Sequence, residues 1–183
     1  MGDLRPTSGP EAGAPRLRPA RPDEAERVAR FHWETRLAAL SAVWPVEVIT
    51  HRPFEERLAG WRALVGAPDF GAARTVEILE DDAGAIAGVV SAGPGREDLG
   101  PWTGQVYQLY LREDLRGRGL GRRLLRVGFD FLARAGHGRG YLWTPGANPA
   151  SRGFYEHCGG ELFREEPLPR HPAFTRVAYG WTL

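Results

Sequence analysis

One segment near the middle of the chain joins a strand pattern to a helix pattern through a turn rich in glycine and arginine. The strand pattern is GQVYQLYL (Gly104 to Leu111), and the helix pattern is GRRLLRVGFDFLARAG (Gly121 to Gly136). Glycines in the turn RGRGLG (116–121) let the backbone bend sharply and approach a ligand closely. Such a unit predicts a sheet with helices packed on it.

The turn has the features of an anion site. The helix that follows directs unpaired N–H groups and the positive end of its dipole at the turn, so phosphate is the natural guest. Four arginines can add charge-assisted hydrogen bonds. They are Arg116, Arg118, Arg122 and Arg123. A glycine-rich turn with solvated arginines is the purely structural alternative.

Two common phosphate motifs do not match this turn. A nucleotide P-loop needs Gly-Lys-Ser/Thr, and the chain has no lysine. A dinucleotide-binding fold needs G-x-G-x-x-G near the start of a βαβ unit, whereas here the spacing is G-x-G-x-G and three strand patterns precede the strand that leads into the turn.

Charge and cysteine content exclude several classes of protein. All 24 cationic residues are arginine, yet the net charge is only +1, which argues against a nucleic-acid partner. The positive charge is local, because eight arginines lie between residues 112 and 139 against Glu113, Asp114 and Asp130. The single cysteine, Cys158, excludes an internal disulfide and an all-cysteine metal site, and we expect no metal. Neither a membrane span nor a signal peptide is predicted, so a cytoplasmic location is expected.

Periodicity divides the chain into a tail and one domain. Residues 1–15 are rich in Pro, Gly and Ala and are predicted to be disordered, and residues 16–183 form a single domain. Strands are predicted at 16–20, 74–80, 85–93, 104–111, 141–144, 161–168 and 174–183. Helices are predicted at 22–40, 52–65, 121–136 and 148–159. This order predicts a mixed sheet with helices packed on it.

Two motifs resemble those of the GNAT family of N-acetyltransferases. That family carries Arg/Gln-x-x-Gly-x-Gly/Ala after a strand, and Arg116, Gly119 and Gly121 fill the pattern here. NPASRGFYEHCGG resembles its second motif, an asparagine (Asn148) followed seven residues later by a tyrosine (Tyr155). The likeness runs through residues 16–183 in element order, including the paired N-terminal helices.

The resemblance implies a fold and a ligand. The fold would be α/β, with a mostly antiparallel sheet of about six to seven strands, about four flanking helices, and a V-shaped opening between two central strands. Acetyl-CoA would lie in the opening as acyl donor. Asn148 would reach the pantetheine amide, and Tyr155 would return a proton to the leaving thiolate. The remaining cofactor-binding residues would be Leu109, Tyr110 and Leu111 on the pantetheine, and Arg116, Gly117, Arg118, Gly119, Leu120, Gly121 and Arg122 on the pyrophosphate.

The general base is where the chain departs from the family pattern. An amine of pKa ~10.4 is about 3.4 units from neutrality at pH 7, which costs roughly 4.6 kcal/mol. Many family members carry a glutamate near the start of the strand before the loop, but Gln105 stands there. Glu34, Glu77, His32 or a water relay are the substitutes we consider. An acceptor of lower pKa would need less help.

Trp33, Arg36 and Gln105 are the candidate substrate contacts, although core packing would explain the first two equally well. The expected activity is acetyl-CoA-dependent N-acetylation of an amine on a small molecule or protein, by direct attack in a ternary complex without a covalent enzyme intermediate. The alternative is a sensor that binds a CoA thioester without turnover, which the missing carboxylate favours. Family analogy also raises the expectation of a homodimer.

Overall fold

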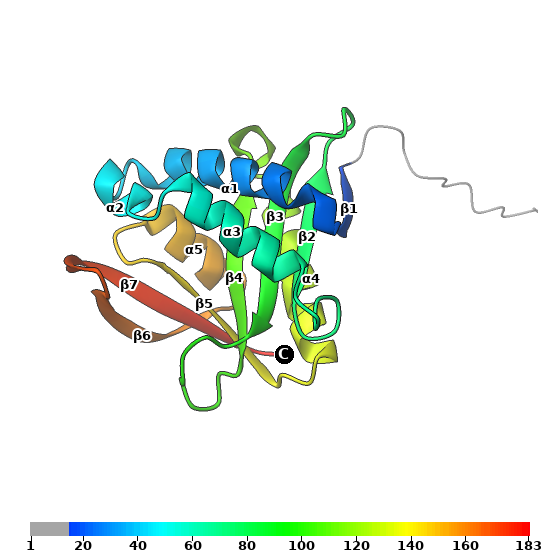
Figure 1. Ribbon diagram of the computed structural model, residues 1–183. Helices are drawn as coiled ribbons and strands as arrows, with labels where there is room; N and C mark the ends of the chain where they lie inside the picture. The colour runs from blue at the N-terminus through cyan, green and yellow to red at the C-terminus, as the bar shows by residue number, and fades with distance from the viewer. Residues whose placement is uncertain (1–14) are drawn as a thin grey trace, which may run out of the picture.

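Seven strands form one sheet in the computed structural model, which describes residues 15–183. Apart from Pro15, the predicted tail 1–15 lies outside the described residues. The spatial order of the strands is β1-β2-β3-β4-β5-β7-β6 (Figure 1). Their bounds are β1 Arg16–Pro19, β2 Thr75–Glu80, β3 Ile86–Pro94, β4 Gly104–Leu111, β5 Arg139–Pro145, β6 Glu161–Leu168 and β7 His171–Thr182.

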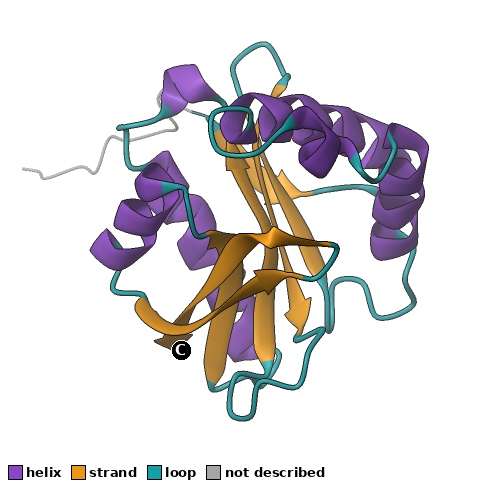
Figure 2. Ribbon diagram, turned by 90° about the vertical axis from the view of Figure 1, so that its left-hand side faces the viewer, coloured by secondary structure: helices purple, strands orange, loops and turns teal. Residues whose placement is uncertain are grey.

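Helices cover both faces of this sheet (Figure 2). Alternation along β2 shows how the faces divide, because Ile78 packs in the cluster of α1 and α3, whereas the next residue, Leu79, packs with α4. Tyr155 of α5 lies in the same cluster as α4. The helices are α1 Ala25–Leu40, α2 Val46–Thr50, α3 Phe54–Val65, α4 Leu120–Arg134 and α5 Pro149–His157.

The sheet opens between β4 and β5, its one parallel pair among the described strands. These strands pair only at Gly104 with Gly140 and at Gln105 with Tyr141. Just beyond, the β3–β4 register shifts so that Tyr107 has no partner, which is a β-bulge. A bulge bends and twists its strand, so β4 diverges from β5 over its remaining residues. This confirms the predicted V-shaped opening.

Sequence patterns predict the seven strands and four of the five helices. The fifth, α2, is too short at five residues to show a helical period. It is held by tertiary packing: Val48 and Ile49 lie in a small core cluster with Trp44, and Leu168 and Phe174 from the β6–β7 hairpin pack against that cluster. The helix predicted from residue 22 begins as a 3₁₀ turn, Pro22–Glu24, before α1. No helix within residues 15–183 is long and apolar enough to cross a membrane.

A cluster of partly buried ion pairs connects β1 to the 3₁₀ turn that leads into α1. Arg18 donates to both carboxylate oxygens of Glu24 at 2.7 Å and also to Glu80 of β2. Glu24 further accepts from Arg27 and from the backbone N–H of Arg21. The hydrogen bonds from Arg18 lower the pKa of Glu24 to about 2, so this carboxylate stabilises the fold most where it is ionised.

We predict that Glu24→Gln lowers the free energy of unfolding at neutral pH by about 3 kcal/mol, because it leaves the charge of Arg18 only partly balanced by a carboxylate. For a chain of this size that is roughly 6–12 °C in Tm. The folded-state pKa is depressed, so the contribution is complete above about pH 4.5 and declines as the pH falls toward 2. Thermal melts at pH 7 and pH 4 measure this, and the difference between wild type and variant should shrink at pH 4. Glu26→Gln, at an exposed pair with Arg30, is the control and should cost less than about 0.5 kcal/mol; equal losses would contradict the prediction.

Candidate active site

A cavity of about 1150 Å³ occupies the opening between β4 and β5. Residues 106–111 of β4 form one wall, and residues 142–145 of β5 form the other. The β4–α4 loop and α5 close one part of it. The part we call the α2 side is lined by α1, α2 and the turn between β6 and β7. Its residues include Arg36, Leu40, Trp44, Val48, His51, Arg52, Leu168, Pro169, Arg170 and His171.

Two glycines shape the β4–α4 loop. Gly117 and Gly119 have φ of +74° and +76°, a left-handed conformation that favours glycine. A Cβ at either position would meet no atom within 4 Å, so the backbone is open to the cavity that both residues line. Gly119 is also the N-cap of α4, and no side chain caps the first N–H groups of that helix. The loop therefore presents backbone donors and the positive end of a 15-residue helix to the cavity.

Asn148 both caps α5 and lines the cavity. Its Oδ1 accepts from the backbone N–H of Ser151 at 3.1 Å. The capping bond uses the carbonyl oxygen of the side chain, so the Nδ2 donor is available to a ligand. Pro149 follows as the first helical residue, as the sequence pattern predicts.

Tyr155 is a buried residue of α5, and its side chain lies between that helix and the sheet. Its ring packs against Phe154, Tyr179 and Trp181, with centroids 5.2, 5.9 and 6.2 Å away, and the residue also lines the cavity. Burial is the main cause that raises the pKa of this phenol far above its usual value of 10. Tyr155 therefore keeps its proton across the physiological range and can only donate it.

The cavity gathers most, but not all, of the residues predicted for the site. It is lined by Leu109, Tyr110, Leu111, Arg116, Gly117, Gly119, Gly121, Arg122, Asn148, Tyr155 and Arg36. Arg118 is exposed, and Leu120, the first residue of α4, packs against the core; neither residue lines the cavity. Trp33 packs on Phe54, at 6.1 Å between ring centroids, and lies outside it.

Gln105 also lies outside the cavity, where β4 and β5 still pair. Its Oε1 accepts from the Arg96 backbone N–H and from the Tyr141 hydroxyl, both at 3.1 Å. This residue joins the two strands at the closed end of the opening.

None of the three side chains considered as substitute bases lines the cavity. Glu34 is exposed. Glu77 accepts from the hydroxyl of Thr75 at 2.9 Å, and burial raises its pKa. His32 is buried against Tyr110, and desolvation, with the charges of Arg36 and Arg57, lowers its pKa to about 3.

Two histidines that sequence reasoning missed lie on the α2 side of the cavity. The rings of His51 and His171 meet edge to face, with centroids 5.5 Å apart. His51 Nδ1 lies 2.7 Å from the carbonyl oxygen of Val48; since a carbonyl only accepts, Nδ1 carries the proton and Nε2 keeps its lone pair. Burial, together with the charge of Arg57, lowers the pKa of His51, so the imidazole is neutral at pH 7. His51 is the C-cap of α2 and His171 is the first residue of β7, so neither residue belongs to a periodic pattern in the sequence.

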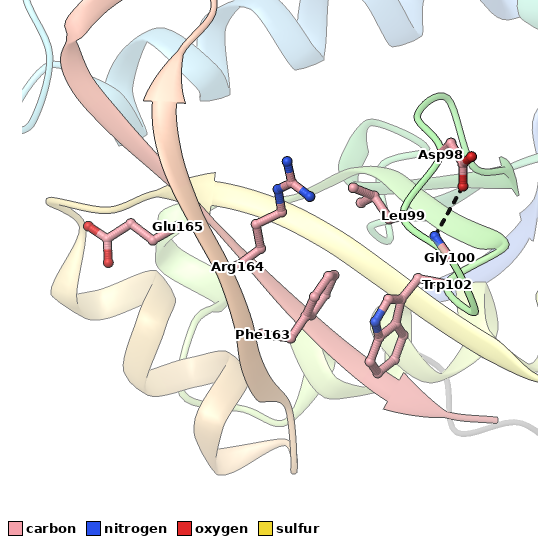
Figure 3. A pocket seen from close by; sticks show the side chains of 7 residues that line it. All are labelled: Asp98, Leu99, Gly100, Trp102, Phe163, Arg164 and Glu165. Carbon is pink, nitrogen blue, oxygen red and sulfur yellow. Dashed lines mark hydrogen bonds between the residues drawn. The ribbon is translucent and has the colours of Figure 1, made fainter.

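A second, smaller hollow of about 570 Å³ lies between the loop before β4 and strand β6 (Figure 3). Trp102 stacks on Phe163 there, with ring centroids 4.5 Å apart and planes 19° from parallel. This hollow shares no lining residue with the cavity of the β4–β5 opening. Within residues 15–183, no group of three or more His, Cys, Asp or Glu is placed to hold a metal ion.

Comparison with known proteins gives the family of this chain. The profile of the Acetyltransferase (GNAT) family matches residues 36–160, which is more than half of the chain. The uncharacterized N-acetyltransferase YuaI of Bacillus subtilis (strain 168) is 26% identical over 152 residues, covering 82% of each chain.

Solved structures share the fold. PaiA N-acetyltransferase of Thermoplasma acidophilum, in complex with coenzyme A, gives a TM-score of 0.69 at 12% identity over 93% of this chain and 99% of that one. The yncA protein of Salmonella typhimurium, solved with acetyl-CoA, gives 0.65 at 22% identity over 93% and 94%. By the profile match the chain belongs to the GNAT family of acetyltransferases, and it is an acyltransferase enzyme.

Proposed function

We propose that this protein is an acetyl-CoA-dependent N-acetyltransferase that acetylates an amine by direct attack in a ternary complex. One observation carries the proposal: a single cavity joins the glycine–arginine loop, Asn148 and Tyr155 along the half of β4 that β5 does not pair. Its volume exceeds the roughly 300–1000 Å³ of an ordinary small-molecule site, which is consistent with room for two substrates.

The residues present fit a CoA thioester. The open space at Gly117 and Gly119, beside uncapped N–H groups of α4, is a cradle for the pyrophosphate, with Arg116 and Arg122 as charged neighbours. Backbone groups of Leu109 to Leu111 face the opening without a β5 partner, so they would pair with the pantetheine arm as a strand pairs with a peptide. Nδ2 of Asn148 would donate to a pantetheine carbonyl. Bound acetyl-CoA supplies an acetyl group activated as a thioester.

His51 is the cavity residue best suited to take the proton of the amine. Its neutral imidazole has a free lone pair on Nε2, and the residue is exposed enough to pass the proton on to water. No carboxylate from residues 15–183 lines the cavity. A base with a lowered pKa assists weakly basic amines best, which agrees with the expectation from the missing strand glutamate.

Tyr155 would stabilise the sulfur as it leaves. A free phenol is already a weaker acid than a thiol, so complete transfer of its proton costs about 2 kcal/mol in water. Burial raises the pKa of Tyr155 and increases that cost. We therefore assign the hydroxyl to donating a hydrogen bond to the sulfur as negative charge develops there.

The loop is tested by Gly119→Glu, which places a carboxylate where the pyrophosphate would bind. Acetyl-CoA at about 100 times its Kd should add about 2.7 kcal/mol to wild-type stability, a rise of roughly 5–11 °C in Tm. The variant should lose this rise. Gly136→Glu is the matched control, because Gly136 also has positive φ (+91°) and open space around its Cβ but lies at the other end of α4. Normal acetyl-CoA binding by Gly119→Glu would remove the loop from the site.

Tyr155→Phe should lower kcat by about 100-fold and change acetyl-CoA affinity less than threefold, because the hydroxyl acts only as the thiolate forms. Steady-state kinetics with a thiol reagent measure both constants. Tyr179→Phe is the control, since that hydroxyl bonds Glu156 and Arg152 and the residue does not line the cavity. An unchanged kcat in Tyr155→Phe would exclude this role.

Release of free thiol in the presence of a panel of amines distinguishes an enzyme from a CoA-thioester sensor. Amine-dependent release by wild type supports the proposed transfer. Acetyl-CoA binding with no release above the rate without amine, across aryl, alkyl and amino-acid amines, would favour the sensor.

A further inference from the structure

Three partly buried arginines of this chain are each neutralised by two carboxylates. Arg18 bonds Glu24 and Glu80. Arg112 bonds Asp81 and Asp114. Arg176, which lines the cavity, bonds both oxygens of Glu97 at 3.0 Å and also bonds Glu166. Against this background, an arginine in the cavity wall without any carboxylate partner requires an explanation.

Arg36 is such a residue. It extends from α1 into the cavity wall, and its Nη1 donates to the hydroxyl of Tyr110 at 3.3 Å. No carboxylate within residues 15–183 forms a salt bridge with it. Its Nε is buried and has no hydrogen-bond partner in that part of the chain. A half-buried guanidinium without a counter-ion is energetically costly unless a ligand supplies one.

Arg57 adds a second positive charge behind Arg36. It donates to the backbone carbonyls of Arg52 and Ile49 and lies over the ring of Trp33. Burial, followed by repulsion from Arg36, lowers the pKa of Arg57 to about 10. Two guanidinium groups that repel each other at this depth create a positive field, which an anion in the cavity would relieve.

The same wall contains other unsatisfied donors. Among the buried side-chain nitrogens that lack a partner within the described residues are the indole Nε1 atoms of Trp44 and Trp143, and both residues line the cavity. An indole N–H can only donate. With Arg36, the α2 side of the cavity and the adjoining β5 wall thus combine excess donors and positive charge with no described carboxylate.

We propose that the acceptor is an amine that also carries a carboxylate, and that Arg36 binds this carboxylate on the α2 side of the cavity. The inference rests on the proposed N-acetyltransferase function and names its substrate class. The planar fork of a guanidinium matches a carboxylate in bidentate geometry, and one arginine balances the single charge of a carboxylate, whereas a phosphate group carries nearly two charges. Leu40, Trp44 and Val48 form an apolar wall beside it, so the body of the acceptor is apolar.

The reaction leaves the recognised group unchanged. The amine nitrogen forms a bond to the acetyl carbon, the carbon–sulfur bond breaks, and its electron pair stays on sulfur. One amine proton leaves through His51 to water, and the sulfur leaves as CoA thiolate, which is protonated from solvent. The products are an N-acetylated amino acid with a free carboxylate and CoA.

Matched acceptors test this assignment. L-Leucine and L-phenylalanine are compared with their amides, which keep the amine and the apolar body but lack the charge. We expect kcat/KM to be about 10- to 100-fold higher for the acids. The intrinsic reactivity of the amine favours the amides instead, because the carboxylate of the acids makes the neighbouring amine more basic and harder to deprotonate. A preference for the acid therefore reports recognition of the carboxylate.

Arg36→Met should raise KM for the acids and remove most of this preference, while kcat/KM for the amides and the KM for acetyl-CoA stay within threefold. Arg36→Lys should recover part of the preference for the acids, because lysine keeps the positive charge but lacks the planar, bidentate guanidinium. Arg30→Met is the control, because Arg30 is an exposed residue of the same helix that pairs with Glu26. It should leave the preference intact.

Three outcomes would overturn the proposal. They are a kcat/KM for the acids no higher than that for the amides in wild type, an unchanged preference in Arg36→Met, or a higher kcat/KM for the matched 1-aminoalkylphosphonate than for the carboxylate. Failure of the underlying function is separate: it would appear as no Tm shift with acetyl-CoA or no thiol release with any amine. A wild type that acetylates the amides but not the acids would retain the N-acetyltransferase function and refute only the carboxylate site.

Discussion

The early end of pairing between β4 and β5 is the constraint on which the rest of the structure depends. After Gln105 the backbone of β4 has no strand on its β5 side, although interior N–H and C=O groups normally all find partners. The bulge at Tyr107 makes this arrangement stable by turning the strand away. The opening is therefore fixed by the fold and not by the movement of a loop, and the glycine–arginine loop and α5 are held at its rim by the elements that form the core.

Arginine has two uses in this chain, and only the structure separates them. Arg18, Arg112 and Arg176 each bridge two carboxylates and connect elements distant in sequence. Arg36 has the same chemistry but no such partner among the described residues, and it lines the cavity. Composition could not reveal this difference, because the absence of lysine makes every cationic residue look alike in the sequence.

The sequence predicts local features well and side-chain direction poorly. The strand, the glycine turn and α4 follow from short-range rules, and Asn148 caps α5 as its position indicates. Trp33 and Gln105 were predicted to contact substrate from the helix and strand that carry them, but side-chain packing determines where each side chain lies. Trp33 packs on Phe54, and Gln105 lies where β4 still pairs with β5. His51 and His171 meet only because the β6–β7 hairpin packs on the five-residue helix α2, and that long-range contact has no period in the sequence.

Opposite pKa shifts in one cavity divide the proton chemistry between two sides. Burial raises the pKa of Tyr155, so this side of the cavity keeps a proton, which we propose is shared with the leaving sulfur. Burial and nearby guanidinium charge lower the pKa of His51, so the α2 side has a neutral imidazole, which we propose accepts the proton of the amine. Environments that separate the pKa values of two groups commonly define acid and base roles.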